Sequence, residues 1–425
     1  MPTLKYRYLP FFMWFFPLTF FTYQFILRLW PSLMMNQIMQ LFAVDASGFG
    51  LLASLYYYGY STTQIPIALM IDRFKARYII FLCATLCGIA TLGFTYTTNW
   101  YVACLSRFLI GIGSAVGFLG VSKVISEWFP KDQYARMVGF SFSIGLLGAI
   151  YGGKPINILV ENYTWQKVAL SLGCISILIG ICTYLFLRSP QKSTNHIERV
   201  EVTASNFKKL LVSPSIWLLA IANLLMVGSL EGFADVWGVQ YLMTAYNLNK
   251  SNAAELTSFI FVGMLFGGPL LASLSKILGN YLVISLCGLG MAVAFILLMS
   301  NIHSNWYWMA SLFFLIGIMC CYQVVIFAAG ADLVLPQLLG VTIAFLNCVN
   351  MLGGSFFHTV IGLLMDASWS GIVGNDGVRQ YTLESYKTSL MIIPICGIVG
   401  AIIVGLMRIR LYLNKSSAYI GSISN

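Results

Sequence analysis

The stretch NWYVACLSRFLIGIG, residues 99–113, recurs 206 residues later as NWYWMASLFFLIGIM, residues 305–319. Three further matches keep the same order at offsets of 203 to 207: residues 72–78 match 275–281, Pro130 matches Pro336, and residues 28–30 match 235–237. Matches in one order at nearly one offset predict that the chain consists of two parallel structural repeats.

The composition indicates a membrane environment. Hydrophobic residues make up 59% of the 425 and charged residues only 9%, whereas an ordinary soluble domain is about 25% charged. A disordered chain would be rich in charge and poor in aromatic residues, which reach 15% here. The sequence therefore excludes a soluble globular protein and a disordered one, and predicts an integral membrane protein.

Twelve apolar runs are each long enough to cross a bilayer, for which about 20 residues suffice. They predict helices near residues 10–39, 47–71, 78–97, 100–123, 136–156, 167–187, 215–245, 253–275, 282–301, 306–330, 340–366 and 387–408. We therefore expect an all-α membrane fold in which twelve transmembrane helices form two pseudo-symmetric six-helix bundles. The first helix of each half is longer than a bilayer requires, so tilt or an irregular end is expected.

A hydrophilic stretch separates the repeats. It predicts an N-terminal bundle at 1–187, a cytoplasmic linker at 188–213, and a C-terminal bundle with a short cytoplasmic tail at 214–425. Basic residues collect in cytoplasmic loops. With both termini in the cytoplasm, 17 of the 24 Lys and Arg fall on that side and 5 on the other. This asymmetry, with the short loops, predicts a multi-pass protein of the cell inner membrane.

Two segments of the first repeat combine charged residues with apolar ones: the loop D-R-F-K-A-R, residues 72–77, and the run R-F-L-I-G-I-G, residues 107–113. The loop is similar to the D-R-x-G-x-R signature of the major facilitator superfamily, with Lys75 in place of the Gly. The run R-F-L-I-G-I-G, residues 107–113, resembles its R-x-x-x-G-x-G element. The resemblance covers the whole chain and implies alternating-access transport. Residues 145–155 resemble the antiporter signature but lack its Gly-Pro pair, which argues against a drug–proton antiporter.

A narrower resemblance concerns the first and seventh helices. An Arg followed by Trp-Pro (Arg28, Trp30 and Pro31) and the run F-A-D-V-W-G, residues 233–238, are similar to a branch that holds phagosomal nutrient transporters and a lysosomal dipeptide uniporter. That resemblance implies an amino-acid or short-peptide substrate.

Arg28 lies inside the first apolar run. A charge in the hydrocarbon core costs at least about 2.5 kcal/mol, so it needs a compensating reason. A guanidinium matches a carboxylate in a two-pronged geometry, and we expect Arg28 to bind a substrate carboxylate, with Gln24 and Tyr23 one turn away as further substrate-binding residues. A structural ion pair or a side chain reaching the membrane surface is the alternative.

Glu231 and Asp235 are the acidic counterpart in the seventh helix. Their spacing of four residues places both carboxylates on one helix face. Two carboxylates in a dry site cannot both ionise cheaply, so both are candidates for substrate binding and for proton coupling. The alternative for Asp235 is simple solvation near the outer end.

Two further residues are candidates inside apolar runs. Arg107 is matched by Phe313 in the second repeat, so its charge is not needed for packing alone, and we expect it to bind substrate or to pair with Glu231. His358, in the eleventh helix, titrates near neutrality and is a candidate for proton coupling, although a lone core histidine is the alternative. Lys154 is expected to reach the membrane surface.

Asp72, Arg73 and Arg77 are expected to form a cytoplasmic gate whose contacts bias the inward- and outward-facing states. Asp332, near the inner end of the tenth helix, is a further gating candidate. Glycines such as Gly111 and Gly268 are expected to permit close helix packing.

Other chemistry is not indicated. The sequence has no nucleotide-binding loop, nucleophile elbow or metal-ligand spacing, so we expect no enzyme activity, cofactor or metal. The net charge of +10 follows from topology, so no nucleic-acid partner is expected. The expected partners are a small-molecule substrate, a coupling proton and the lipid bilayer, and a monomer is expected.

The sequence thus predicts a secondary active transporter, a proton symporter of an amino acid or short peptide. One alternative is a transporter of an organic anion such as a carboxylate siderophore or a hexuronate. Another, of a different class, is a non-transporting membrane solute sensor.

Overall fold

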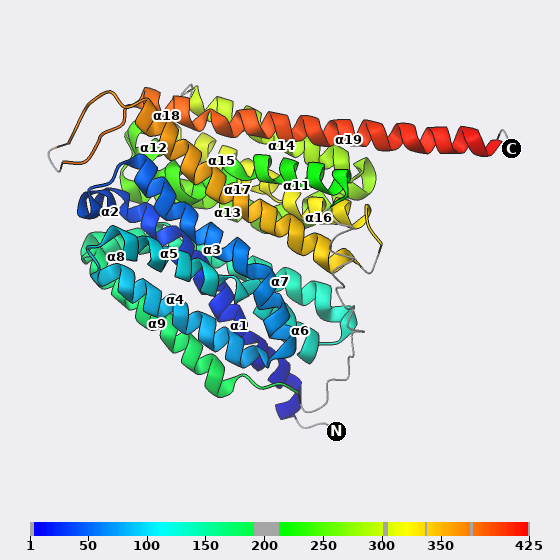
Figure 1. Cartoon of the computed structure of the whole chain (residues 1–425), viewed down its shortest axis with the longest axis horizontal. Coiled ribbons are helices and arrows are strands. Elements are labelled where there is room, and N and C mark those ends of the chain that lie inside the picture. Colours follow the sequence, from blue (N-terminus) through cyan, green and yellow to red (C-terminus); the bar gives the residue numbers. More distant parts are fainter. Residues whose placement is uncertain (1–3, 191–211, 301–304, 336–337, 375–376, 424–425) are drawn as a thin grey trace.

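The computed structural model describes residues 4–190, 212–300, 305–335, 338–374 and 377–423. Within these ranges the chain is helical apart from its connections and one isolated β-bridge between Val373 and Arg379. The helices form two bundles that lie side by side, α1–α9 in the lower half of Figure 1 and α11–α19 in the upper half. The predicted all-α fold is confirmed.

Within the described ranges each bundle contains six spans, several of them built from two or more consecutive segments. In the N-terminal bundle these are α1 (Leu4–Leu29) with η1 (Trp30–Met34) and α2 (Met35–Phe42), α3 (Ala46–Arg73), α4 (Ala76–Tyr96), α5 (Trp100–Ser114) with α6 (Val116–Trp128), α7 (Lys131–Gly152) with α8 (Lys154–Asn162), and α9 (Trp165–Phe186). In the C-terminal bundle they are α11 (Pro214–Met226) with η2 (Val227–Ser229), η3 (Leu230–Trp237) and α12 (Gly238–Tyr246), α13 (Lys250–Leu278), α14 (Asn280–Met299), α15 (Trp306–Cys320) with α16 (Tyr322–Ala331), α17 (Leu339–Ala367), and α18 (Leu383–Leu390) with α19 (Ile392–Ile423).

The span α3 differs from the others in composition. Among the described residues, eleven segments are long and apolar enough to cross a membrane, and α3 is the twelfth span by its place in the bundle. It has 28 residues but carries tyrosine, serine, threonine and glutamine side chains between residues 54 and 64. A polar helix is stable in a membrane only when its polar side chains face protein, and α3 packs along α17 of the other bundle.

The breaks inside the helices repeat between the two halves. The span α5–α6 is interrupted at Ala115 and the span α15–α16 at Cys321, which is 206 residues later. Asn99 and Asn305 cap the two spans in the same way, each accepting a hydrogen bond from a backbone N–H of the first turn. The predicted internal repeat therefore appears as a repeat of local structure.

Close contact between helices depends on glycine at equivalent positions. A Cβ atom on Gly111 would lie 2.0 Å from the Tyr56 carbonyl oxygen, and one on Gly317 would lie 2.0 Å from that of Ile260. The expected packing role of Gly111 is confirmed, whereas that of Gly268 is wrong, because a Cβ there would meet no atom within 4 Å.

Polar contacts join the two bundles at the predicted outer end, at the left of Figure 1. The Arg379 guanidinium lies 3.3 Å from the Asp45 carboxylate and 3.2 Å from that of Asp366. The first turn of α3 leaves backbone N–H groups without helical partners. Ser47 N–H donates to Asp366 at 2.8 Å, and Ala46 N–H donates to the Tyr381 hydroxyl at 3.0 Å. We call this group the outer latch: Asp45, Ala46, Ser47, Asp366, Arg379 and Tyr381.

A second contact lies at the same end. The Lys154 ammonium lies 2.7 Å from the Glu255 carboxylate of the C-terminal bundle. The expectation that Lys154 merely reaches the membrane surface is therefore wrong. Both side chains are 38% exposed, and an exposed pair contributes only about 0–1 kcal/mol. It helps to align the bundles without holding them firmly.

The bundles also meet away from the outer end. The Cys348 thiol of α17 donates to the Ser61 carbonyl oxygen of α3 at 3.1 Å, and the Ser355 hydroxyl donates to the Ser54 carbonyl oxygen at 3.1 Å. The predicted linker 188–213 lies mostly in residues 191–211, outside the described part of the chain, and its cytoplasmic position stays a prediction.

Replacing Gly111 by Ala should lower the free energy of unfolding by about 1–3 kcal/mol, because the added methyl group forces α3 and α5 apart. The matched control is Gly268→Ala, which should be neutral or slightly stabilising. Thermal unfolding of the purified variants measures both. Equal effects of the two substitutions would contradict the proposed packing.

Replacing Arg379 by Ala should shift the population toward opening at the predicted outer end, because two carboxylates at the mouth lose their common cation. A cysteine placed at Ser47 should then react with a membrane-impermeant maleimide several-fold faster than in the parent. Lys387→Ala, at another basic site of the same end, is the control. An unchanged labelling rate would show that the outer latch does not hold this end closed.

The outer latch should also depend on pH. Partial burial raises the pKa of Asp45, but hydrogen bonds from Gly48 and Ser47 and the charge of Arg379 outweigh that effect and hold the pKa below its ordinary value. A lowered carboxyl pKa means that the contribution to stability is present at neutral pH and is lost as the pH falls through the lowered value, below about 4. Maleimide reacts with the thiolate, so its rate falls with pH at any cysteine. The labelling rate of the cysteine at Ser47, divided by that of a free thiol at the same pH, should therefore change little between pH 8 and about 5, and rise only in stronger acid.

Candidate functional site

The first helix of the chain ends next to Arg28. Pro31 has no backbone N–H, so the Leu27 carbonyl loses the donor that a continuous helix would supply four residues later. The chain continues as the short 3₁₀ segment η1. This break leaves carbonyl groups without partners in the protein interior, where such groups are costly.

Arg107 fills this gap. Its guanidinium donates to the carbonyl oxygens of Leu27 at 2.8 Å and Arg28 at 3.1 Å, and lies 5.1 Å from the centre of the Tyr56 ring. The structure does not bring Arg107 into contact with Glu231. Arg107 thus holds the broken end of α1, and its predicted substrate contact stays a prediction.

The seventh span is irregular at the equivalent place. Residues Leu230–Trp237 form the π-helical segment η3, which contains both Glu231 and Asp235. Such segments are rare and frequent at functional sites. The His358 Nε2 donates to the Glu231 carbonyl oxygen at 2.6 Å, which fixes the position of η3 from the eleventh span. The irregularity expected at an end of the long first helix of each half lies in its interior instead.

The charges from the two irregular spans meet. Arg28 Nε lies 3.0 Å from Asp235 Oδ2, and its Nη1 lies 3.3 Å from Glu231 Oε2. The Tyr57 hydroxyl contacts both carboxylates. We call Arg28, Tyr57, Glu231 and Asp235 the central cluster. Two of its members come from each bundle, so it joins the halves in the membrane interior.

The central cluster is almost completely enclosed. The Arg28 side chain is 9% exposed and the two carboxylates are 1% exposed. An ion pair this deep stabilises only if its geometry is good and its remaining polar atoms are satisfied, and removing one partner costs about 3–5 kcal/mol. Any solute that enters must therefore replace the contacts that it breaks.

Tyr57 constrains the protons of the cluster. A phenol carries one proton, so its hydroxyl can donate to only one of the two carboxylates. The contact with the other carboxyl is a hydrogen bond only if that carboxyl carries a proton. The geometry therefore accommodates one proton shared between Glu231 and Asp235, and balances the remaining carboxylate against Arg28.

The other predicted substrate residues, Gln24 and Tyr23, are not part of the central cluster. Gln24 accepts a hydrogen bond from the Tyr56 hydroxyl at 3.4 Å, on the same face of α1 as Arg28. Tyr23 donates to the Leu172 carbonyl oxygen inside its own bundle. Gln24 thus lies near the central cluster, while Tyr23 has a packing contact.

Among the predicted gating residues whose side chains the structure describes, Arg73, Arg77 and Asp332, none contacts another across the bundles. The side chain of Asp72 lies outside the described part of the structure. The Arg77 guanidinium lies 4.6 Å from the Tyr78 ring, and Arg73 lies over Phe74. Asp332 accepts a hydrogen bond from Asn280 at 2.9 Å. These contacts all stay within one bundle, and the gate stays a prediction.

Several residues of the site were not singled out from the sequence. Tyr57 belongs to a run of tyrosines that could equally line a pore or lie at the membrane surface. The outer latch residues lie in connections, where charge is unremarkable. A weak signal was present for Asp366, an acidic residue at the end of an apolar run, and for Arg379, one of only 5 basic residues on the predicted outer side.

Known proteins share this architecture. The chain is similar to a bacterial homologue of the lysosomal transporter Spinster in an inward-facing, occupied conformation, with a TM-score of 0.72, 17% identity, and coverage of 93% of this chain and 96% of that one. It is also similar to the nucleoside transporter NupG, with a TM-score of 0.74, 12% identity, and coverage of 93% and 99%. At these identities the likeness concerns the fold.

Two of the relatives found by sequence match over only about half of their own length. A probable L-galactonate transporter of Escherichia coli is 25% identical over 53% of this chain and 53% of its own length. An uncharacterised transporter of Bacillus subtilis is 25% identical over 42% and 45%, so the chain spans about half the length of these relatives. A membrane sensor protein of Escherichia coli, UhpC, is 23% identical over 80% and 82%.

A family profile matches most of the chain. Residues 15–358 match the Major Facilitator Superfamily, and this match includes every residue of the central cluster. The two six-helix repeats, the motifs at residues 72–77 and 107–113 and this match lead to one conclusion: the chain belongs to the major facilitator superfamily.

Proposed function

We propose that the chain is a secondary transporter in which the two bundles rock around the central cluster and expose it alternately to the two sides of the membrane. The observation that carries this proposal is the buried ion cluster shared by the bundles, Arg28 and Tyr57 on one side and Glu231 and Asp235 on the other. Alternating access requires a site between two repeats near the middle of the bilayer. We place the protein in the cell inner membrane, with both termini in the cytoplasm.

The substrate class follows from charge balance. A solute that separates Arg28 from its carboxylates must supply an anion to the arginine and a cation to the acids, because an unpaired buried charge is costly. An amino acid or a short peptide carries both groups on one molecule. We therefore propose a zwitterionic amino acid or peptide, with its carboxylate on Arg28 and its ammonium between Glu231 and Asp235.

Protons enter through the same carboxylates. The shared proton would neutralise one carboxyl, while the other stays ionised and receives the substrate ammonium as the substrate carboxylate takes its place on Arg28. A proton and a substrate would then bind in the same state of the protein, which is the requirement for symport. His358 holds the main chain of η3 and would keep Glu231 in place during this exchange.

A second candidate is an organic anion. The sequence relatives include a probable L-galactonate transporter and, at 23% identity, a chloroplastic ascorbate transporter of Arabidopsis thaliana. An anion would pair with Arg28 but would supply no ammonium to pair with Glu231 and Asp235. The sensor alternative is kept open by UhpC, whose match covers 80% of this chain.

Transport into proteoliposomes tests the proposal. With an inward proton gradient, the parent should accumulate labelled alanine or dialanine. Glu231→Gln should abolish accumulation while leaving exchange of substrate across the membrane, because the variant still binds but no longer carries a proton. Arg28→Ala should abolish both. Glu384→Gln, an exposed carboxyl in the first turn of α18, is the matched control.

Other outcomes distinguish the alternatives. Uptake of a hexuronate that tolerates Glu231→Gln but not Arg28→Ala would favour the organic anion. Binding of a solute through Arg28 without any flux in either direction would favour the sensor. Accumulation of alanine or dialanine that is unchanged in Glu231→Gln would contradict the proton-coupling role.

A further inference from the structure

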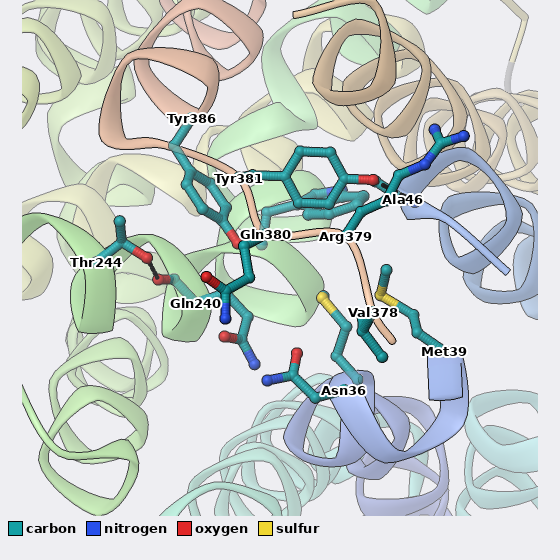
Figure 2. A pocket seen from close by; sticks show the side chains of 12 residues that line it. Asn36, Met39, Ala46, Gln240, Thr244, Val378, Arg379, Gln380, Tyr381 and Tyr386 are labelled. Atoms are coloured by element: carbon teal, nitrogen blue, oxygen red, sulfur yellow. Dashed lines mark hydrogen bonds between the residues drawn. The ribbon is translucent and has the colours of Figure 1, made fainter. Parts of the chain in front are cut away.

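A cavity lies at the predicted outer end, apart from the central cluster. Its volume is about 300 Å³, at the lower end of the range for sites that hold small ligands. Both bundles contribute to it, through α2, α12 and the connection between α17 and α18. We call it the outer cavity (Figure 2).

Three carboxamide side chains converge in the outer cavity. Asn36 comes from α2, Gln240 from α12 and Gln380 from the connection before α18, and Figure 2 shows all three directed into the same space. Gln240 is only 8% exposed. Among the described residues, no hydrogen bond is made by any of these three amide groups. Asn36 and Gln380 are exposed to water, but Gln240 is buried, and a buried amide normally finds partners. They present both donors and acceptors to an occupant.

Among the described residues that line the cavity, the one cationic side chain is Arg379. It is paired with Asp45 and Asp366 in the outer latch. The base is formed by Trp237, whose buried indole N–H has no partner among the described residues, and by apolar side chains such as Met35 and Met39. A neutral solute with paired hydrogen-bond donors and acceptors and a small apolar group fits this lining, whereas an ion has no free counter-charge.

Access differs between the two sites. Asn36, Thr244 and Gln380, at the mouth of the outer cavity, are exposed, while the central cluster is enclosed. Trp237, at the base, lies two residues from Asp235 in η3. A solute in the outer cavity would therefore be bound while the outer latch is closed, next to the segment that carries the two carboxylates.

We infer that the outer cavity is a second binding site, which takes the neutral amide of a peptide or carboxamide solute before it reaches the central cluster. The assignment to a peptide rests on the proposed function. The existence of the site does not, because it depends only on the lining amides.

Two probes separate the sites. N-acetylalaninamide is a neutral diamide and should bind only to the outer cavity, whereas dialanine carries both charges and should also bind at Arg28. Ligand-observed NMR titration of the purified chain in lipid nanodiscs measures both. Gln240→Leu and Gln380→Ala should each weaken N-acetylalaninamide at least tenfold. Gln380→Ala changes a connection and not a helix, so it guards against a folding defect in the other variant.

The controls fix the interpretation. Gln166→Leu, an exposed amide at the start of α9, should leave binding of the diamide unchanged. No binding of the diamide to the parent, or equal binding to the parent and to both cavity variants, would overturn the second site. Dialanine binding that is insensitive to Arg28→Ala would instead contradict the proposed central site, whatever the diamide does.

Discussion

The structure depends on one constraint, that charge inside a membrane must be neutralised by charge inside the protein. The Arg28 side chain is only 9% exposed, and its partners Glu231 and Asp235 lie on the other bundle. The cost of separating them makes the central cluster the strongest polar connection between the halves. The same cost means that the bundles can part there only when protons or a solute take over the contacts. The contact between the bundles and the selection of solutes therefore both follow from the cost of an unpaired buried charge.

Irregular backbone gives the cluster its shape. Pro31 ends α1 beside Arg28, and the π-helical turn of η3 presents Glu231 and Asp235 at the equivalent place of the second repeat. Each irregularity exposes carbonyl groups that need donors. Arg107 supplies them for α1 and His358 for η3. A buried arginine can bind a substrate or donate hydrogen bonds to the main chain. The structure shows that Arg107 donates to the main chain.

The sequence predicted the spans and the repeat because hydrophobic length and matching segments are local properties. It also indicated Arg28, Glu231 and Asp235, because a charge in an apolar run needs a reason. It could not indicate Tyr57, since a tyrosine is equally at home in a pore and at a membrane surface. Nor could it pair Asp45 with Arg379, because charges in connections carry no desolvation cost that would reveal a partner, and their contact depends on how the bundles meet.

The pseudo-symmetry of the chain offers the most direct test of the central cluster. Arg28 and Asp235 occupy matching positions of the two repeats, 207 residues apart. Arg28→Asp and Asp235→Arg should each lower the thermal unfolding midpoint sharply, because each leaves buried charge unbalanced. The double exchange restores the same charges in mirrored places and should recover most of the loss. A double variant as unstable as the sum of the two single variants would contradict the claim that this pair holds the bundles together.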